Sequence, residues 1–202
     1  GNNINVKKFG GTGALVGTGQ WIVNCDENFT LTTEVGITYE RKDDYGNTIA
    51  ISASPLTKNG TGKMTITPGK LNGMLTVNDG IVAFNDKNLS TLVNGKYQTY
   101  VKNSGRLVGQ GYFNGLTIQN GGEIKPCGST VLETTQGTIK CANTININEG
   151  ATATFLIRTA AQNSAFETKN LTFNGTLKIE LGSSLIPEAG QQWTLWTVSN
   201  TL

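Results

Sequence analysis

Side chains that could carry out acid–base or metal chemistry are scarce in this sequence. The 202 residues include no histidine, which excludes histidine-activated nucleophiles and histidine metal sites. The 14 acidic residues include two adjacent pairs, Asp43–Asp44 in the charged run 40–47 and Asp26–Glu27 in an expected turn. Cleavage of a glycosidic bond needs two carboxylates that face each other about 5 to 10 Å apart. Neighbouring residues of an extended strand point to opposite faces, so we expect both pairs to lie in solvent-exposed turns or loops.

The sequence supports an enzyme that cleaves glycans by elimination no better than it supports a hydrolase. A polysaccharide lyase would need a lysine or arginine base beside a carboxylate-bound Ca²⁺. The sequence has no Asp-rich nonapeptide Ca²⁺ repeat, and Glu40, Asp43 and Asp44 lie in the charged run 40–47, which we expect to be a solvated loop. We therefore expect no catalytic residues, no cofactor and no metal site. A carbohydrate-active enzyme, of the polysaccharide lyase or glycoside hydrolase kind, remains the alternative.

Aromatic side chains are the candidates for ligand binding, because sugar rings stack on exposed aromatic faces. Tyr97, Tyr100 and Tyr112 fall in the segment 87–114, which we interpret as an insertion between two repeat units. Loops on a rigid scaffold often carry binding residues. The sequence thus predicts a binding lip for a glycan or another extracellular host ligand. Ordinary packing of the three tyrosines within strands is the alternative.

Charge and cysteine content limit the partners further. The formal net charge is +2, with basic and acidic residues spread along the chain, so we expect no nucleic acid partner. No run approaches the roughly 18 apolar residues of a transmembrane helix, so we expect no membrane insertion by this segment. Cys25, Cys127 and Cys141 form no metal-binding spacing. We expect small buried thiols, with a Cys127–Cys141 disulfide as the alternative.

The elements that must position these residues are short strands. The chain contains 29 Thr, 26 Gly and 22 Asn, which suit pleated surfaces and tight turns. A short unit recurs in which apolar and polar residues alternate and a glycine follows. It occupies residues 75–80, 116–121 and 145–150, with a shorter form at 171–175.

Strand follows strand with no helical pattern between, which leaves a parallel β-helix or an antiparallel sandwich or barrel. The short strands between Gly and Asn turns favour an all-β, single-stranded right-handed parallel β-helix, with an antiparallel β-sandwich as the alternative. A coil of roughly 20 residues predicts about nine or ten coils in a single domain, 1–202. Trp193 and Trp196 are expected on opposite faces of one late strand, one in the core and one capping the helix end.

Three stretches carry a resemblance to a known family. Residues 56–66 (LTKNGTGKMTI) and 73–84 (GMLTVNDGIVAF) resemble the autotransporter-associated β-helical repeat, L-x-K-x-G-x-G-T-L-x-L followed by G-x-T-x-V-x-x-G-x-L. Residues 115–129 and 175–196 are similar to later coils of autotransporter passenger regions. The resemblance implies a right-handed parallel β-helix, a segment of a longer exported bacterial protein at the cell surface or beyond. It implies a structural or adhesin role, with the rest of the parent chain at the termini.

Overall fold

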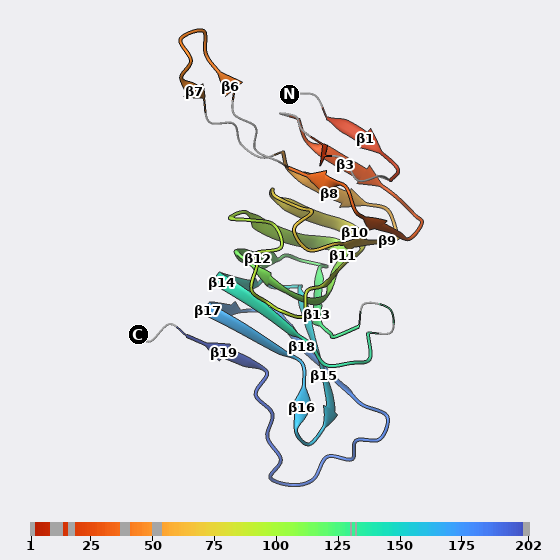
Figure 1. Cartoon of the computed structure of the whole chain (residues 1–202). Coiled ribbons are helices and arrows are strands. Elements are labelled where there is room, and N and C mark those ends of the chain that lie inside the picture. The colour runs from red at the N-terminus through yellow and green to blue at the C-terminus, as the bar shows by residue number, and fades with distance from the viewer. Residues whose placement is uncertain are drawn as a thin grey trace.

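The computed structural model describes residues 3–8, 14–15, 19–36, 41–49, 54–129, 131 and 133–199. These residues form strands and turns that wind along one long axis, and the strands of successive coils lie on top of each other (Figure 1). The described residues include no helix that could cross a membrane.

Parallel pairing between coils builds the first face of the helix. Leu75, Leu116, Ile145 and Leu171, which open the four repeat units recognised in the sequence, belong to one line of register through this stack. The stack consists of β1 (Ile4–Val6), β3 (Trp21–Asn24), β8 (Leu56–Asn59), the start of β10 (Leu75–Asn85), the start of β11 (Gln98–Phe113), β12 (Gly115–Ile118), the end of β14 (Thr138–Ile147) and the end of β17 (Ala165–Phe173).

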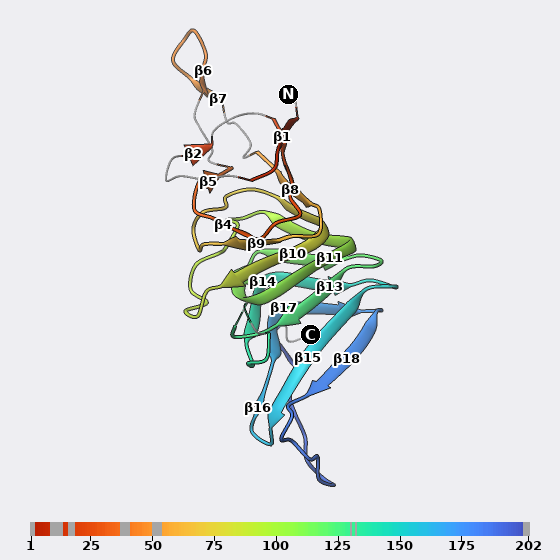
Figure 2. The same cartoon turned by 90° about the vertical axis from the view of Figure 1, so that its right-hand side faces the viewer.

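Two further lines of parallel pairing form a second and a third face, and Figure 2 shows the second face, with β13, β15 and β18 toward the viewer. The second face runs through β4 (Phe29–Leu31), β9 (Lys63–Ile66), the later parts of β10 and β11, β13 (Glu123–Pro126), β15 (Thr152–Thr159) and β18 (Thr176–Leu181). The third face joins the end of β11 to the starts of β14 and β17 and to β19 (Trp196–Val198). At the N-terminal end, β2 (Ala14–Leu15) pairs in parallel with β5 (Glu34–Val35).

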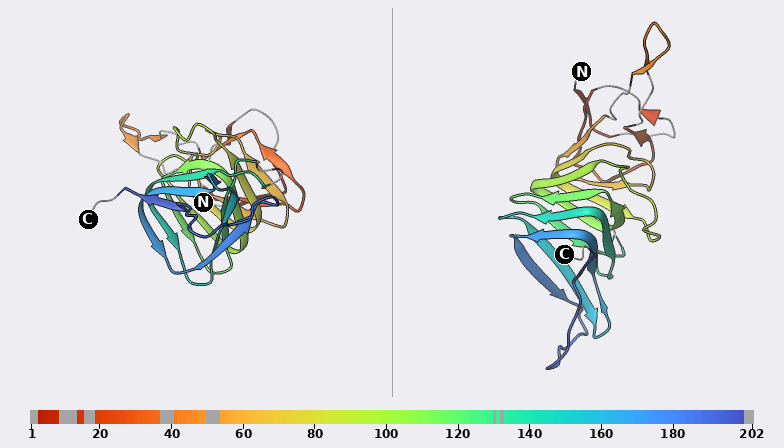
Figure 3. Two further views of the ribbon diagram at one scale, coloured as in Figure 1. Left: turned by 90° about the horizontal axis from the view of Figure 1, so that it is seen from below. Right: turned by 90° about the vertical axis from the view of Figure 1, so that its left-hand side faces the viewer.

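The prediction of a parallel β-helix is confirmed, and the antiparallel sandwich is wrong. Antiparallel pairing among the described strands is confined to the hairpin of β6 (Arg41–Lys42) with β7 (Thr48–Ile49) and to the pairing of β15 with β16 (Gln162–Asn163). Seen along the axis, the successive coils superpose in one outline (Figure 3, left). Alternate residues point inward, so that Leu75, Val77, Leu116 and Ile118 are fully buried.

The coils are longer and fewer than predicted. Among the described residues the first face holds eight strands, from β1 to β17, whereas nine or ten coils were predicted. Asn24 and Asn59 hydrogen-bond between adjacent coils although they lie 35 positions apart in the chain. The corresponding separation between Asn59 and Asn78 is 19. Insertions at the corners therefore lengthen some coils without disturbing the stacked strands.

Asparagine side chains link the first coils along one edge of the first face. Asn24 donates to Asn5 (3.4 Å), Asn59 donates to Asn24 (2.8 Å) and Asn78 donates to Asn59 (2.8 Å), each through Nδ2 to Oδ1. An interstrand ladder of amide side chains is thus present along the first coils. Asn24 and Asn59 are register partners, and the ladder satisfies polar groups of adjacent strands.

The cysteines are all free and buried, as the sequence predicted, and Cys127 and Cys141 form no disulfide. Each thiol faces a backbone carbonyl at a corner of the helix, such as Ser129 O for Cys127 (3.4 Å). Burial raises the pKa of all three thiols. For Cys127, burial together with the charge of Glu133 raises the pKa to about 11 from an ordinary value of 9.0.

This shift predicts a loss of stability in alkali. Between pH 9 and pH 11 the unfolded chain has released the Cys127 proton that the folded chain retains, so stability falls as the pH rises through this window. Two pKa units correspond to about 3 kcal/mol. In reducing buffer, urea titrations from pH 8 to pH 11.5 should show a decline in unfolding free energy that is smaller by this amount in Cys127→Ala. Equal declines in both proteins would contradict the assignment.

The last coil leaves inward-facing side chains uncovered. Leu177, Ile179 and Leu181 of β18 are 43, 39 and 49% exposed. Their partners one coil earlier, Ala153, Phe155 and Ile157, are at most 5% exposed. The equivalent side chains of the preceding coil are covered, so the side chains of β18 form an exposed apolar surface at this end of the helix.

The two late tryptophans lie near this end but do not share a strand. Trp196 begins β19 and stacks on Phe173, with ring centroids 5.7 Å apart, so it covers part of the open end as expected. Trp193 precedes the strand, and its Nε1 donates to the carbonyl of Thr159 (3.0 Å). The prediction that one of the two lies in the core is wrong.

Candidate functional site

The third face of the helix aligns outward-pointing side chains from four coils. Tyr112, Lys140, Glu167 and Thr197 occupy equivalent positions of β11, β14, β17 and β19. Their chain neighbours on β11, β14 and β17, such as Phe113 and Phe166, are buried, so alternation turns this row toward solvent. Adjacent strands of a sheet lie about 4.8 Å apart, which sets the spacing of the row.

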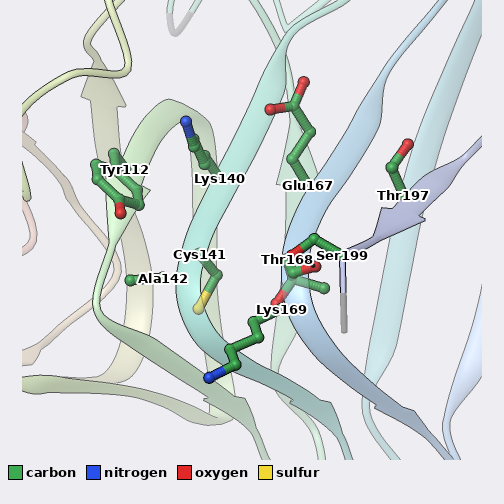
Figure 4. Close-up of a pocket in the computed structure, with 9 residues that line it drawn as sticks. All are labelled: Tyr112, Lys140, Cys141, Ala142, Glu167, Thr168, Lys169, Thr197 and Ser199. Atoms are coloured by element: carbon green, nitrogen blue, oxygen red, sulfur yellow. Dashed lines mark hydrogen bonds between the residues drawn. The ribbon is translucent and has the colours of Figure 1, made fainter. Parts of the chain in front are cut away.

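The row lines a groove of about 420 Å³ on the outer surface. Figure 4 shows Lys140 and Glu167 projecting side by side from neighbouring strands, with Tyr112 beside Lys140. The Nζ of Lys140 lies 5.1 Å from the centre of the Tyr112 ring, a cation–π distance. The remaining lining residues are Cys141, Ala142, Thr168, Lys169 and Ser199.

This groove combines an aromatic face with donors and acceptors of hydrogen bonds. The Tyr112 ring can stack on the apolar face of a sugar ring. The ammonium groups of Lys140 and Lys169 donate hydrogen bonds, the Glu167 carboxylate accepts them, and the Thr197 hydroxyl does both. An elongated ligand rich in hydroxyl groups matches such a surface better than an apolar ligand does.

Of the three predicted binding tyrosines, only Tyr112 lines this groove. Tyr100 points outward from the first face, in register between Thr76 and Thr117. Tyr97 lies in the turn before β11, where its carbonyl accepts a hydrogen bond from Asn94 Nδ2 (3.0 Å). The interpretation of 87–114 as an inserted loop is wrong, because 16 of these residues form β11 within the helix. The three tyrosines therefore do not form one site.

A second groove, of about 610 Å³, crosses the outer side of β13, β15 and β18. At its centre Lys125 is buried, although it points outward. Its Nζ lies 2.7 Å from Glu180 Oε2 and 3.7 Å from Glu133 Oε2. Glu133 also pairs with Arg106 (2.9 Å), which fixes the loop after β13 over the second face.

The second groove favours the ionised form of Glu180. Burial raises the pKa of Glu180, but hydrogen bonds and charges from Lys125 and Lys178 outweigh burial and lower it. The Nζ of Lys178 lies 3.0 Å from Glu180 Oε1. Glu180 is therefore a charged hydrogen-bond acceptor near neutral pH, whereas a general acid must hold a proton there.

Each of the two acidic pairs seen in the sequence contains an aspartate that accepts hydrogen bonds in a turn. Asp43 Oδ1 accepts hydrogen bonds from the backbone N–H groups of Tyr45 (3.0 Å) and Asn47 (2.8 Å) in the exposed β6–β7 hairpin. Asp26 Oδ1 accepts hydrogen bonds from the backbone N–H and hydroxyl of Thr61. Hydrogen bonds lower the pKa of both carboxyls, from the side-chain amide and the backbone N–H of Asn47 for Asp43 and from Thr61 for Asp26. No group of three or more His, Cys, Asp or Glu side chains among the described residues could hold a metal ion.

Comparison with known proteins adds no family assignment, because no family model and no curated protein matches this chain. The class that the coordinates define is a parallel β-helix with two polar grooves on its outer surface.

Proposed function

We propose that this chain is a non-catalytic structural and adhesin-type β-helix module of an exported bacterial surface protein, which binds glycan on its outer face. The observation that carries the proposal is the row Tyr112–Lys140–Glu167–Thr197 along one groove. Because neighbouring coils supply these side chains, the row is held by the backbone pairing of the helix and is ordered before any ligand arrives.

The location at the bacterial surface rests on the resemblance of 56–66 and 73–84 to the autotransporter-associated β-helical repeat. The coils support such a role physically. Each coil pairs with its neighbours through backbone hydrogen bonds along several strands, which stiffens the stack and keeps surface side chains at a fixed spacing. A purely mechanical spacer would have no use for an aromatic side chain in an outward groove.

A carbohydrate-active enzyme is the second candidate, and one observation favours it. Glu133 and Glu180 both lie within 4 Å of Lys125 Nζ, so two carboxylates converge on one groove. Glycosidases need a comparable pair, with one carboxyl group protonated by a raised pKa. Here the pKa of Glu180 is lowered, because hydrogen bonds and charges from two lysines outweigh burial. The groove therefore suits binding better than hydrolysis.

The proposed function predicts that Tyr112 is needed for binding. On a broad glycan array, the chain should bind a subset of uncharged oligosaccharides, and Tyr112→Ala should reduce the affinity for them about fivefold or more, since aromatic stacking contributes about 1 to 3 kcal/mol per ring to binding. Tyr100→Ala is the matched control, because Tyr100 points outward from another face of the same strand. No binding across the array, or equal loss in both variants, would refute the proposal.

A further inference from the structure

The second groove contains one cation that the fold does not use. Arg106, Lys125 and Lys178 each pair with a glutamate at 3.0 Å or less. Arg158 also lines the groove and is exposed, but within the described part of the chain it makes no ion pair or side-chain hydrogen bond. A guanidinium group offers a planar fork of donors that matches a carboxylate or a sulfate ester.

Further donors line the groove beside Arg158. Gly182, which follows β18, is the register neighbour of Arg158 and begins a turn closed by Leu185 N–H to Gly182 O (3.0 Å). The two central residues, Ser183 and Ser184, line the groove and are exposed. Across the described residues, their N–H groups donate to no backbone carbonyl. Hydroxyl and N–H donors next to an unpaired guanidinium form a site for a single oxyanion.

The rest of the groove fits uncharged hydroxyl groups. The carboxylates of Glu133 and Glu180 lie 3.7 and 2.7 Å from Lys125 Nζ, and their remaining lone pairs can accept hydrogen bonds from ligand hydroxyls. Lys125 and Arg158 balance the two glutamates, so the lining carries no net charge. A densely charged polyanion would meet both carboxylates and be repelled, whereas a ligand with one oxyanion among several hydroxyls would not.

The second groove is long enough to bind an oxyanion and several hydroxyl groups of one ligand. Lys125 follows the register pair Ile124–Ala153 and so lies level with position 154 of β15, four residues before Arg158, which spans about 13 Å along a strand. Leu156 lies between them with 5% exposure and provides a narrow apolar floor. The recognition elements thus follow one another along β15, with hydroxyl acceptors near Lys125 and the oxyanion site at Arg158.

We propose that this second groove binds an acidic oligosaccharide of low charge density, with its carboxylate or sulfate at Arg158 and its hydroxyls at Glu133 and Glu180. The site is separate from the Tyr112 groove and does not depend on it. The oxyanion binds the guanidinium and the serine donors, and the intervening neutral sugar hydroxyls face Glu133 and Glu180.

Isothermal titration with three tetrasaccharides tests the proposal. A hyaluronan tetrasaccharide carries carboxylates only, a keratan sulfate tetrasaccharide carries sulfates only, and a chitin tetrasaccharide is uncharged. We expect at least one acidic probe to bind at least tenfold more tightly than the neutral probe, with weaker binding at high salt. The two acidic arms distinguish carboxylate from sulfate. Failure of both acidic probes to bind, or equal binding of the neutral one, would overturn the proposal.

Variants assign the binding to this groove. Arg158→Gln should weaken acidic-probe binding at least tenfold and leave the melting temperature unchanged, because the wild-type side chain makes no intramolecular ion pair in the described structure. Lys87→Gln is the control for the loss of an exposed positive charge elsewhere. Tyr112→Ala should leave acidic-probe binding unchanged, so failure of the proposed function and of this inference are separable. Equal affinity of Arg158→Gln and the wild type would also overturn it.

Discussion

Gly80→Ala is expected to lower the free energy of unfolding by about 4 kcal/mol, through backbone strain and steric overlap together. Gly80 lies within β10, where the chain turns from the first face to the second, and its φ of +66° is in the left-handed region. A Cβ atom there would meet the carbonyl oxygen of Gly60 and come within 2.6 Å of that of Gly62, both in the coil below. Backbone atoms held by coil-to-coil hydrogen bonds cannot move aside easily.

Gly69→Ala separates the two contributions to this effect. Gly69 has a similar φ of +76°, but a Cβ atom there would meet nothing within 4 Å. Gly69→Ala should lower the free energy of unfolding only by the cost of placing alanine in the left-handed region, about 1 kcal/mol. Urea unfolding of both variants and the wild type measures the difference. Equal losses of unfolding free energy in the two variants would mean that a Cβ atom at position 80 does not overlap the carbonyl groups of the coil below.

Lys58→Met is expected to lower the free energy of unfolding by about 3 kcal/mol, because buried carbonyl groups lose their donor. Lys58 lies between Val23 and Val77 in register on the first face, and its side chain is fully buried inside the helix. Its Nζ donates to the carbonyls of Asn59 (2.8 Å) and Gly60 (2.6 Å). Longer contacts reach carbonyls of two neighbouring coils.

The charge on Lys58 is held by these carbonyl dipoles. Burial lowers its pKa, while the nearby Cys25, Asp26 and Asp79 groups oppose that shift. Methionine fills a similar volume without a donor, so chemical denaturation reports the loss of the hydrogen bonds rather than of packing. Lys96→Met, at an exposed position, is the control. Unchanged stability of Lys58→Met would show that the corner carbonyls do not need the ammonium group.

The sequence predicted the stacked strands where apolar residues alternate, and it missed them where polar residues point inward. The units beginning at Leu75, Leu116 and Ile145 stack as their pattern indicates. The intervening coil begins with Thr99, a fully buried residue whose hydroxyl accepts a hydrogen bond from Asn94 (2.9 Å). Alternation alone cannot reveal such a coil, because a satisfied polar pair replaces the expected leucine.

The binding surfaces were less predictable than the fold, because coil lengths vary. Tyr112 could be selected as an aromatic residue, but Lys140 and Glu167 join it only through the register of three coils. Lys125 and Glu180 are 55 positions apart and still form an ion pair of 2.7 Å. The lengths of the insertions cannot be read from the sequence, so a regular repeat spacing does not predict that these residues lie beside one another. A lysine is ordinarily expected at the surface, whereas Lys58 of the L-x-K motif lies inside the helix and donates hydrogen bonds to carbonyl groups at the corner.

Amide chemical-shift mapping of the ¹⁵N-labelled chain, titrated with the uncharged oligosaccharide that binds most tightly on the glycan array, tests the central claim most directly. Our account predicts that the largest changes occur together at Tyr112, Lys140 and Glu167, on three adjacent coils of the third face. The same titration of Tyr112→Ala should show these changes only at much higher ligand concentration. Changes centred on the β6–β7 hairpin or on the first face, with none along the Tyr112 groove, would contradict it.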